Sequence, residues 1–431
     1  MIPRVAWLVV FGTVASAACL FPDVSALDSN GDGASPNDAG ADAAVPNGIA
    51  NAQHVVAPTG NAQQTHVIWA VASKRWWLFY IDDDVTQLKT RSSADFVTWV
   101  DGASLTLTHT NAGEGRNFTV AYAELGGGDD DVVHVSMSHV VSDASLVHTH
   151  TRAVITGETI TFEAPSDTCS IASNPQGPDS PATYVDPNGT VWDATGFVAS
   201  GGTNGMGDYN EDVFLSPSTD NGAAWTNSFS QTTVEVVMST SNARAFFNAG
   251  GIGAIWEDGA QDPNPSNLHF SVFGGGKWSA PSSVFDKDNP QDPNDWGSAN
   301  LTTSSTVEAH IVRALLAGGY EHAYGVGTNG TNAAAPPALP RSIGNGVVVL
   351  ADPSHLAAFD VQSGGALVAS RWNGSAWSPW SAAGATSVGA SLSGYCPNLD
   401  VHPEAKGCAV LWTTSASDGS SWIAGTLVSV R

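Results

Sequence analysis

Basic residues are scarce in this sequence. Its 431 residues include 15 Lys and Arg against 41 Asp and Glu, which gives a formal net charge of −26. Such a charge repels the phosphate backbone of nucleic acids and anionic membrane surfaces. We therefore expect no nucleic-acid partner, and the acidic surface favours solubility outside the cell.

Long amphipathic helices are also absent from the sequence pattern. Only 13% of the residues are charged, whereas Gly numbers 45, Pro 23 and Trp 15. This composition argues against coiled coils and helical bundles and favours strands joined by turns.

The N-terminus has the pattern of an export signal. Arg4 precedes an apolar run over residues 5–14 and then the small residues Ala15-Ser16-Ala17-Ala18-Cys19. We predict a signal peptide over residues 1–18, too short to span a bilayer. Two processing routes remain open: cleavage after Ala17, or lipoprotein processing that leaves Cys19 as a lipid-modified N-terminus. Residues 16–19 resemble a bacterial lipobox, with Ser16 where that motif usually has Leu.

The segment 19–51 favours the lipid route. It is rich in Asp, Ala, Gly, Ser and Pro, and no Lys or Arg occurs between Arg4 and Lys74. Such a segment cannot bury enough apolar surface to fold, so we expect a disordered acidic tether. The prediction is an exported outer-membrane or cell-surface lipoprotein, touching the membrane only through its lipid, and otherwise a periplasmic or secreted protein.

A calcium-like motif lies in this tether. Asp28, Asn30 and Asp32 copy the opening of a calcium loop, but Ala39 stands where the loop needs a bidentate acid. We interpret the motif as linker and predict no metal and no cofactor.

From residue 52 to 431 short apolar or alternating runs are separated by turn residues, which predicts an all-β domain. A Gly-x-x-Trp turn ends at Trp225, Trp278, Trp377 and Trp422, and an incomplete form ends at Trp99. The intervals of 126, 53, 99 and 45 residues between these Trp leave room for one degenerate unit in each long gap. This period predicts a β-propeller of four-stranded blades, seven favoured and six possible. A strand over residues 54–57 could complete the last blade.

The stretch 218–225 fits Ser-x-Asp-x-Gly-x-x-Trp. It resembles the Asp-box (BNR) repeats of the sialidase-like β-propellers, and a partial copy contains Ser93, Asp95 and Trp99. In that family the box lies at the blade periphery, far from the ligand. The resemblance therefore implies structural roles for the four residues that match the box: Ser218, Asp220, Gly222 and Trp225.

The same resemblance suggests candidates for chemistry. Arg116, Arg244 and Arg341 lie beside predicted inner strands and could grip a carboxylate or sulfate, as the arginine triad of sialidases does. The alternative is that each pairs with an Asp. Tyr395 would be the nucleophile and Glu257 its activator. The family's Arg-Ile-Pro signature is absent, because Arg75 is followed by Trp-Trp.

A second candidate site contains three histidines. His148 and His150 share one face of a predicted strand, and polar matching across the hairpin brings His134 to that face. They could hold zinc or supply the base of a polysaccharide lyase. The alternative is a set of exposed, solvated histidines.

The remaining cysteines predict one disulfide. Cys396 and Cys408 are close in sequence and flank a plausible strand pair, so in an oxidising compartment they should be bonded. Cys169 would then be a lone buried thiol.

Together these features predict an exported, surface-tethered propeller that binds or processes extracellular glycans, as a sialidase-type glycoside hydrolase or a polysaccharide lyase if it is an enzyme. The alternative is a non-catalytic lectin-like or protein-binding scaffold. The expected partner is an extracellular glycan or cell-surface ligand, and the protein should be a monomer. The segment 372–377, Trp-Asn-Gly-Ser-Ala-Trp, resembles the repeats of propeller lectins.

Overall fold

The computed structural model divides the chain into two units, Met1–Asp42 and Ala43–Arg431. The structure describes residues 48–51, 65–81, 87–107, 117–122, 130–142, 145–172, 182–185, 189–198, 211–225, 233–236, 240–248, 251–258, 268–274, 277–280, 282–285, 296–302, 307–315, 318–324, 331–341, 346–415 and 421–431. Within them, no helix has the length and apolar character needed to cross a membrane.

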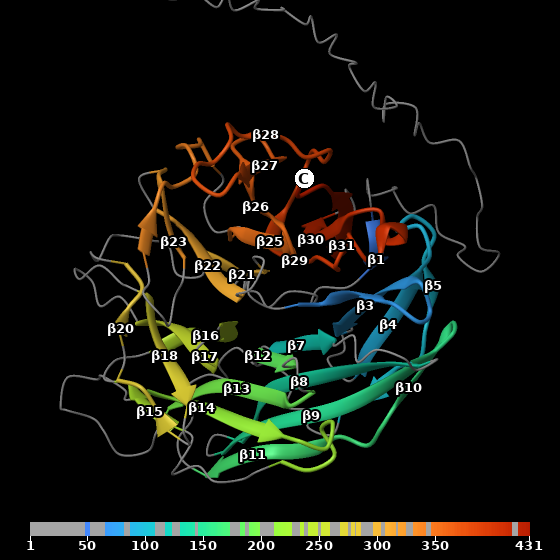
Figure 1. Ribbon diagram of the computed structural model, residues 1–431. Coiled ribbons are helices and arrows are strands. Elements are labelled where there is room, and N and C mark those ends of the chain that lie inside the picture. Colours follow the sequence, from blue (N-terminus) through green and yellow to red (C-terminus); the bar gives the residue numbers. More distant parts are fainter. Residues whose placement is uncertain are drawn as a thin grey trace, which may run out of the picture. The chain divides into compact units, whose positions relative to one another are not determined.

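The described residues form seven antiparallel sheets of four or five strands, which we number as blades in chain order (Figure 1). Blade one holds β2 (Val67–Ala70), β3 (Arg75–Ile81), β4 (Gln87–Ser93), β5 (Val100–Asp101) and β6 (Leu105–Thr106). Blade two holds β7 (Asn117–Tyr122), β8 (Asp130–Ser142), β9 (Ser145–Thr156), β10 (Thr159–Phe162) and β11 (Ser166–Ala172). Blade three holds β12 (Ala182–Val185), β13 (Val191–Val198), β14 (Glu211–Ser218) and β15 (Thr233–Val236).

The other four blades follow the same order. Blade four holds β16 (Thr240–Asn248), β17 (Gly251–Asp258), β18 (Leu268–Gly274), β19 (Lys277–Trp278) and β20 (Ser282–Ser283). Blade five holds β21 (Trp296–Thr302), β22 (Val307–Ala314), β23 (Tyr320–Tyr324) and β24 (Thr331–Ala333). Blade six holds β25 (Val348–Asp352), β26 (His355–Gln362), β27 (Ala366–Trp372) and β28 (Ser381–Ala382). Blade seven holds β29 (Ala390–Tyr395), β30 (Cys408–Ser415), β31 (Ser421–Val428) and β1 (Gly48–Asn51).

The first strand of every blade lies on the inside of a closed ring. The contacts run from β29 to β2, β7, β12, β16, β21 and β25, and from β25 back to β29. Figure 1 shows most of these strands nearest the middle, with β10, β15, β20 and β28 farther out. The architecture is a β-propeller, as the repeat of turns predicted, and the sheets number seven.

The ring is closed by a strand from the N-terminal side of the domain. β1 pairs antiparallel with β31, so Ala50 lies opposite Ile423 and Asn51 opposite Trp422. This corrects the expected boundary at residue 52, since residues 48–51 belong to the propeller and not to the tether. The strand expected over residues 54–57 lies outside the described residues.

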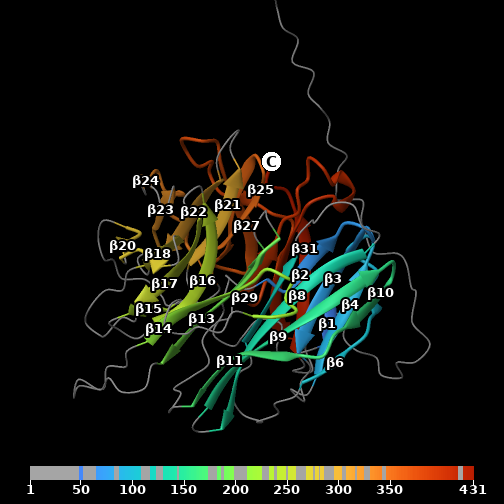
Figure 2. The ribbon, with the colours of Figure 1, turned by 60° about the horizontal axis from the view of Figure 1, so that its bottom comes forward.

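The core lies between neighbouring blades, because both faces of most sheets are buried. On β22, Ala309 and Ile311 pack toward blade four, whereas Val312 and Ala314 pack toward blade six. Blades one and two share a similar cluster that includes Trp77, and Figure 2 shows their strands β3, β4, β8 and β9 side by side. Because side chains alternate along each strand, one strand contributes to the hydrophobic cores on both faces of its sheet.

Candidate functional site

The Asp-box turn of blade three follows β14. Ser218 Oγ donates to Asp220 Oδ1 at 2.7 Å, and Ala224 N–H donates to the same oxygen at 2.8 Å. Gly222 N–H donates to Ser218 Oγ at 2.9 Å. Hydrogen bonds from Ala224 and Ser218 lower the pKa of Asp220, so the carboxylate remains charged and holds the turn. Asp220 therefore shapes the turn, which agrees with the structural role predicted for it.

Blades one and six carry a turn of related design that is one residue shorter. Asp95 Oδ1 accepts from the N–H groups of Val97 and Thr98 at 2.8 and 2.7 Å. In blade six, Asn373 Oδ1 accepts from the N–H groups of Ser375 and Ala376 at 3.0 and 2.8 Å. In each case the Trp stands four residues after the capping side chain. Trp422 differs, because it begins the third strand of its blade and does not close a turn between the third and fourth strands.

The Trp of blade three packs on a histidine pair of blade two. His134 Nδ1 lies 3.1 Å from His150 Nε2, and the two buried rings are stacked at 5.3 Å. His150 meets the ring of Trp225 edge-on at 4.6 Å. Asn221, in the Asp-box turn, places Oδ1 at 3.1 Å from His134 Nε2. We call this contact surface between blades two and three the 2–3 seam.

The contact surface between blades five and six, the 5–6 seam, repeats this arrangement. His310 Nδ1 lies 3.1 Å from His322 Nε2, with the rings stacked at 5.3 Å. Trp377 Nε1 donates to His322 Nδ1 at 3.2 Å. Each pair thus consists of one histidine on the second strand and one on the third, capped by the turn Trp of the following blade.

Burial sets the charge of these histidines. Desolvation lowers the pKa of His134 and of His310 to about 3, and each partner imidazole lowers it further. Desolvation also lowers the pKa of His322 to about 4. All three are neutral at physiological pH. The alternative of exposed, solvated histidines is therefore wrong for His134 and His150.

The two seams differ in the surroundings of the second-strand histidine's Nε2. In the 2–3 seam the amide of Asn221 covers His134 Nε2. In the 5–6 seam His310 Nε2 makes no hydrogen bond with the described residues, and the nearest charged atom is Glu308 Oε2 at 3.9 Å. The side chain of Glu308 is 35% exposed.

Half-buried aromatic side chains lie along the 5–6 seam. Tyr324 stacks on His310 at 5.6 Å, and Trp372 meets His322 edge-on at 4.8 Å. Farther along the seam, Trp380 packs on Tyr320 at 5.2 Å. Tyr324, Trp372 and Trp380 are each partly exposed to solvent. The seam therefore combines aromatic faces with one partly exposed carboxylate.

Sequence reasoning missed this cluster. His310 and His322 have the same alternation as His134 and His150, but their partner Trp377 lies 55 residues from His322 in the chain. A search for histidines on successive strands that each precede a Gly-x-x-Trp turn would have found both pairs.

Arg341 is not an open anion-binding group. Its Nε donates to Asp360 Oδ2 at 2.8 Å, and both side chains are buried. Tyr320 OH donates to the same oxygen at 2.7 Å. Desolvation raises the pKa of Asp360 to about 6, against the opposing effect of Arg341. The prediction that Arg341 binds a substrate anion is therefore corrected. Arg341 is paired with Asp360, as in the alternative that the sequence offered.

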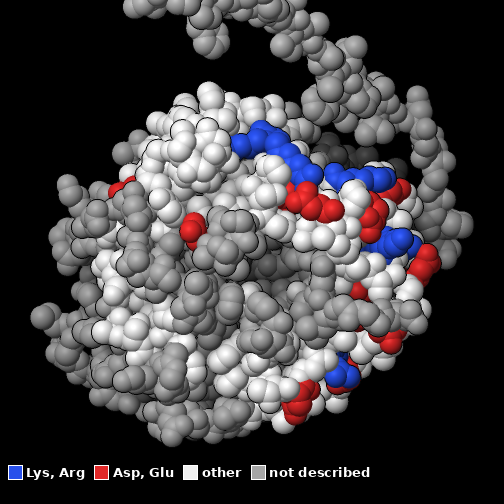
Figure 3. Space-filling view, viewed as in Figure 1, with Lys and Arg blue, Asp and Glu red and all other residues white. Residues whose placement is uncertain are grey.

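Three other described arginines are paired with acids nearer the surface. On the face of the molecule that Figure 3 shows, the basic residues (blue) lie beside acidic residues (red). Arg75 binds Glu158, Arg91 binds Asp101 and Arg152 binds Glu163. Each of these three described arginines is thus paired with a different carboxylate.

The other predicted residues are only partly placed. Arg244 lies within the inner strand β16, opposite Ile255, and Glu257 lies in β17, opposite Leu268. Arg116 lies outside the described residues. Tyr395 ends the inner strand β29, where its ring packs edge-on with Trp76 at 6.3 Å. Its pairing with Glu257 stays a prediction.

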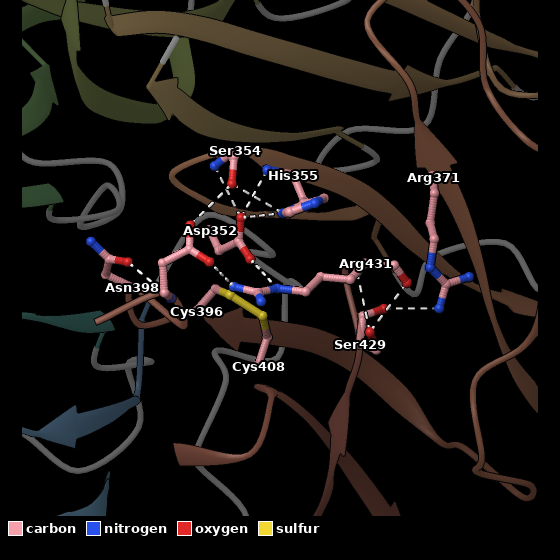
Figure 4. The surroundings of a disulfide bond; sticks show 10 residues. Asp352, Ser354, His355, Arg371, Cys396, Asn398, Cys408, Ser429 and Arg431 are labelled. Atoms are coloured by element: carbon pink, nitrogen blue, oxygen red, sulfur yellow. Dashed lines mark hydrogen bonds and ion pairs between the residues drawn. A yellow bond between two sulfur atoms is a disulfide. The ribbon is translucent and has the colours of Figure 1, made fainter. Parts of the chain in front are cut away.

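The cysteine prediction is confirmed where the structure describes it. Cys396 and Cys408 form a disulfide that joins the end of β29 to the start of β30 (Figure 4). The same view shows Arg431 reaching Asp352 at 2.9 Å. In blade two, Cys169 of β11 lies opposite His148 of β9. Within the described residues, no three His, Cys, Asp or Glu side chains are grouped as metal ligands.

No protein-family model and no curated protein matches this chain. Among solved structures it is similar to the fucose-specific lectin from Aleuria aurantia, at 12% identity and a TM-score of 0.42, over 73% of this chain and 95% of the lectin. It is also similar to an α-L-arabinanase from Penicillium chrysogenum (10%, TM-score 0.43, 72% and 92%) and to an α-L-arabinofuranosidase from Fusarium graminearum (11%, TM-score 0.47, 73% and 93%). At these values the likeness carries no functional argument, and membership of the sialidase-like family stays a prediction.

Proposed function

We propose that this protein is an exported, surface-tethered propeller that binds extracellular glycans at the 5–6 seam. The observation that carries the proposal is a set of partly exposed groups along one seam: the ring of Tyr324 and the carboxylate of Glu308 lie against His310, and the ring of Trp372 lies against His322. Binding sites for small polar molecules combine aromatic faces with a few polar groups that fix orientation. Sugar rings offer both an apolar face and hydroxyl groups.

Binding rather than catalysis is favoured by the placement of the titratable groups. The histidines with lowered pKa and the Arg341–Asp360 pair face a neighbouring blade, and hydrogen bonds to Asn221, Trp377 and Tyr320 join one blade to the next. Perturbed pKa values mark catalytic groups only when these groups face a ligand. Export and tethering rest on the N-terminal sequence pattern ending at Cys19.

A glycan array probed with the purified full chain tests the proposal. We expect selective binding that Trp372→Ala reduces at least tenfold, because this change removes an aromatic face of the seam. Trp99→Ala is the matched control, since Trp99 is a partly exposed Trp of the related turn in blade one. Circular dichroism must show that both variants fold. Absence of glycan binding by the wild type, or equal binding by Trp372→Ala, contradicts the proposal.

A further inference from the structure

The hydrogen bonds of the 5–6 seam favour one position for the proton of each imidazole. An indole N–H can only donate, so the buried N–H of Trp377 is paired only when His322 Nδ1 accepts from it; a proton on Nδ1 would instead bond to the Ala334 carbonyl and leave the indole without this partner. The proton of neutral His322 is then on Nε2, which donates to His310 Nδ1 at 3.1 Å. The Ala334 carbonyl oxygen, 3.2 Å from His322 Nδ1, receives no proton from that nitrogen in this tautomer.

The same logic leaves His310 with its proton on Nε2. This N–H is buried, makes no hydrogen bond with the described residues, and has Glu308 Oε2 at 3.9 Å. Because His310 and Glu308 are two residues apart on β22, they share one face of the strand. The chain Trp377, His322, His310 therefore ends in a donor directed to the Glu308 side of the seam.

The 2–3 seam shows what such a donor normally meets. There His134 Nε2 has Asn221 Oδ1 at 3.1 Å, supplied by the Asp-box turn of the next blade. The residue two before His134 is Val132, so that seam has no acid in the position of Glu308. In blade six, Asn373 stands in the corresponding position, before the glycine of the Gly-x-x-Trp turn. Its Oδ1 accepts hydrogen bonds from backbone N–H groups of its own turn. Only the 5–6 seam thus places a carboxylate at this position.

The charges around the 5–6 seam leave Glu308 uncompensated among the described residues. Arg341 is paired with Asp360. Arg371, next to Trp372, donates to Ser381 Oγ at 3.3 Å and to the Ser429 carbonyl at 2.9 Å. A ligand against Tyr324 and Trp372 would therefore meet one negative charge and no free described cation.

We propose that Glu308, positioned by His310 through the Trp377–His322–His310 chain, is the specificity-determining residue of the 5–6 seam and selects neutral sugars. Its carboxylate accepts hydrogen bonds from hydroxyl groups of a sugar placed against Tyr324 and Trp372. A sugar bearing a carboxylate or sulfate would bring like charge to Glu308 and is rejected. This inference rests on the proposed glycan-binding function and deepens it.

The test compares a neutral glycan identified on the array with its counterpart bearing a carboxylate, titrated by calorimetry against the wild type and Glu308→Gln. Glutamine keeps the size of the side chain and removes the charge. We expect at least a tenfold loss of affinity for the neutral glycan, since a charged acceptor makes the stronger hydrogen bond. We also expect a smaller preference for the neutral glycan over the charged one. The control is Asn221→Ala in the 2–3 seam, which should leave both affinities unchanged.

The role of His310 is tested by a double-mutant cycle. If His310 acts by positioning Glu308, His310→Gln weakens binding in the wild type but has no further effect in Glu308→Gln, whereas a general structural effect would weaken both equally. Wild-type binding that Trp372→Ala abolishes but Glu308→Gln leaves intact overturns this inference and spares the proposed function. Loss of glycan binding altogether, or its survival in Trp372→Ala, overturns the proposed function itself.

Discussion

Gly222 is constrained twice, by its backbone and by the histidines beside it. Its φ is +84°, and a Cβ at this position would lie 2.6 Å from His150 Cε1 and 3.1 Å from His134 Nδ1. We predict that Gly222→Ala destabilises the fold by about 2–5 kcal/mol, the sum of a left-handed backbone and an overpacked seam.

Gly374 provides the matched control. Its φ is +94°, but nothing lies within 4 Å of its Cβ position. Gly374→Ala should cost only the backbone contribution of about 1–2 kcal/mol. Urea unfolding of the two variants measures the difference in their free energy of unfolding. Equal losses of stability would show that the histidine pair moves to accommodate a methyl group at no cost.

The residues that local sequence could place are those whose partners are local. The Asp-box turn was predicted because Ser218, Asp220 and Gly222 bond to one another within five residues. The Arg341–Asp360 pair was only an alternative, since its burial depends on packing between blades. Tyr320 from the neighbouring blade completes it, and no spacing within either strand indicates that contact.

At the scale of the strand, β1 closes the ring with only four residues. Ile49 and Ala50 are buried, and the strand covers the outer edge of β31. We predict that a chain starting at residue 52 loses stability and aggregates, because β31 then presents an unpaired edge. A chain starting at Ala43 should behave like the full chain. Thermal unfolding and light scattering measure both, and identical behaviour of the two shortened chains would make β1 dispensable.

The strands of blade two were predicted well, and β1 was not. Blade two has long alternating runs, which predict strands over residues 117–124, 131–140, 145–155 and 159–164. The observed strands β7 to β10 fall within two residues of these bounds at every end. β1 reads Gly-Ile-Ala-Asn and resembles the small-residue segment before it. Its strand conformation comes from the edge of β31, some 370 residues later, which no local pattern shows.

The two histidine pairs make the seams sensitive to acid. Burial lowers the pKa of His134 and His310 to about 3 and of His322 to about 4, below the 6.5 of an exposed imidazole. The unfolded chain therefore binds more protons below pH 6.5, so the stability that these groups contribute is present above pH 6.5 and is lost as pH falls toward 4. The slope is about 1.4 kcal/mol per pH unit for each histidine.

Urea unfolding between pH 7 and 4.5 tests this prediction. In this window His310→Gln should reduce the slope of stability against pH by about one proton, because one buried imidazole no longer titrates on unfolding. The charged neighbours, Arg152 and Asp193 near His134 and Glu308 near His310, remain in place. An unchanged slope in the variant would mean that the histidine pairs are not the acid-sensitive groups.

For the whole molecule, the ring restricts where a tether can attach. Because β1 is the outer strand of blade seven, the predicted tether precedes an outer strand of the propeller in the chain and not an inner one. The proposed anchor at Cys19 and the proposed binding site in the 5–6 seam therefore belong to separate parts of the chain, so each can be tested alone.

The predicted lipid anchor at Cys19 can be tested without altering the propeller. Lipid at Cys19 would hold the protein in the membrane, since each buried CH₂ of an acyl chain contributes about 0.8 kcal/mol. Expressed in a Gram-negative host with radiolabelled palmitate, the wild type should be labelled and sediment with membranes. Cys19→Ser should be unlabelled and soluble, with the thermal stability of the propeller unchanged, because Cys19 lies outside the unit Ala43–Arg431. If the signal is instead cut after Ala17, both proteins will be soluble and unlabelled, and the propeller is then secreted or periplasmic without an anchor.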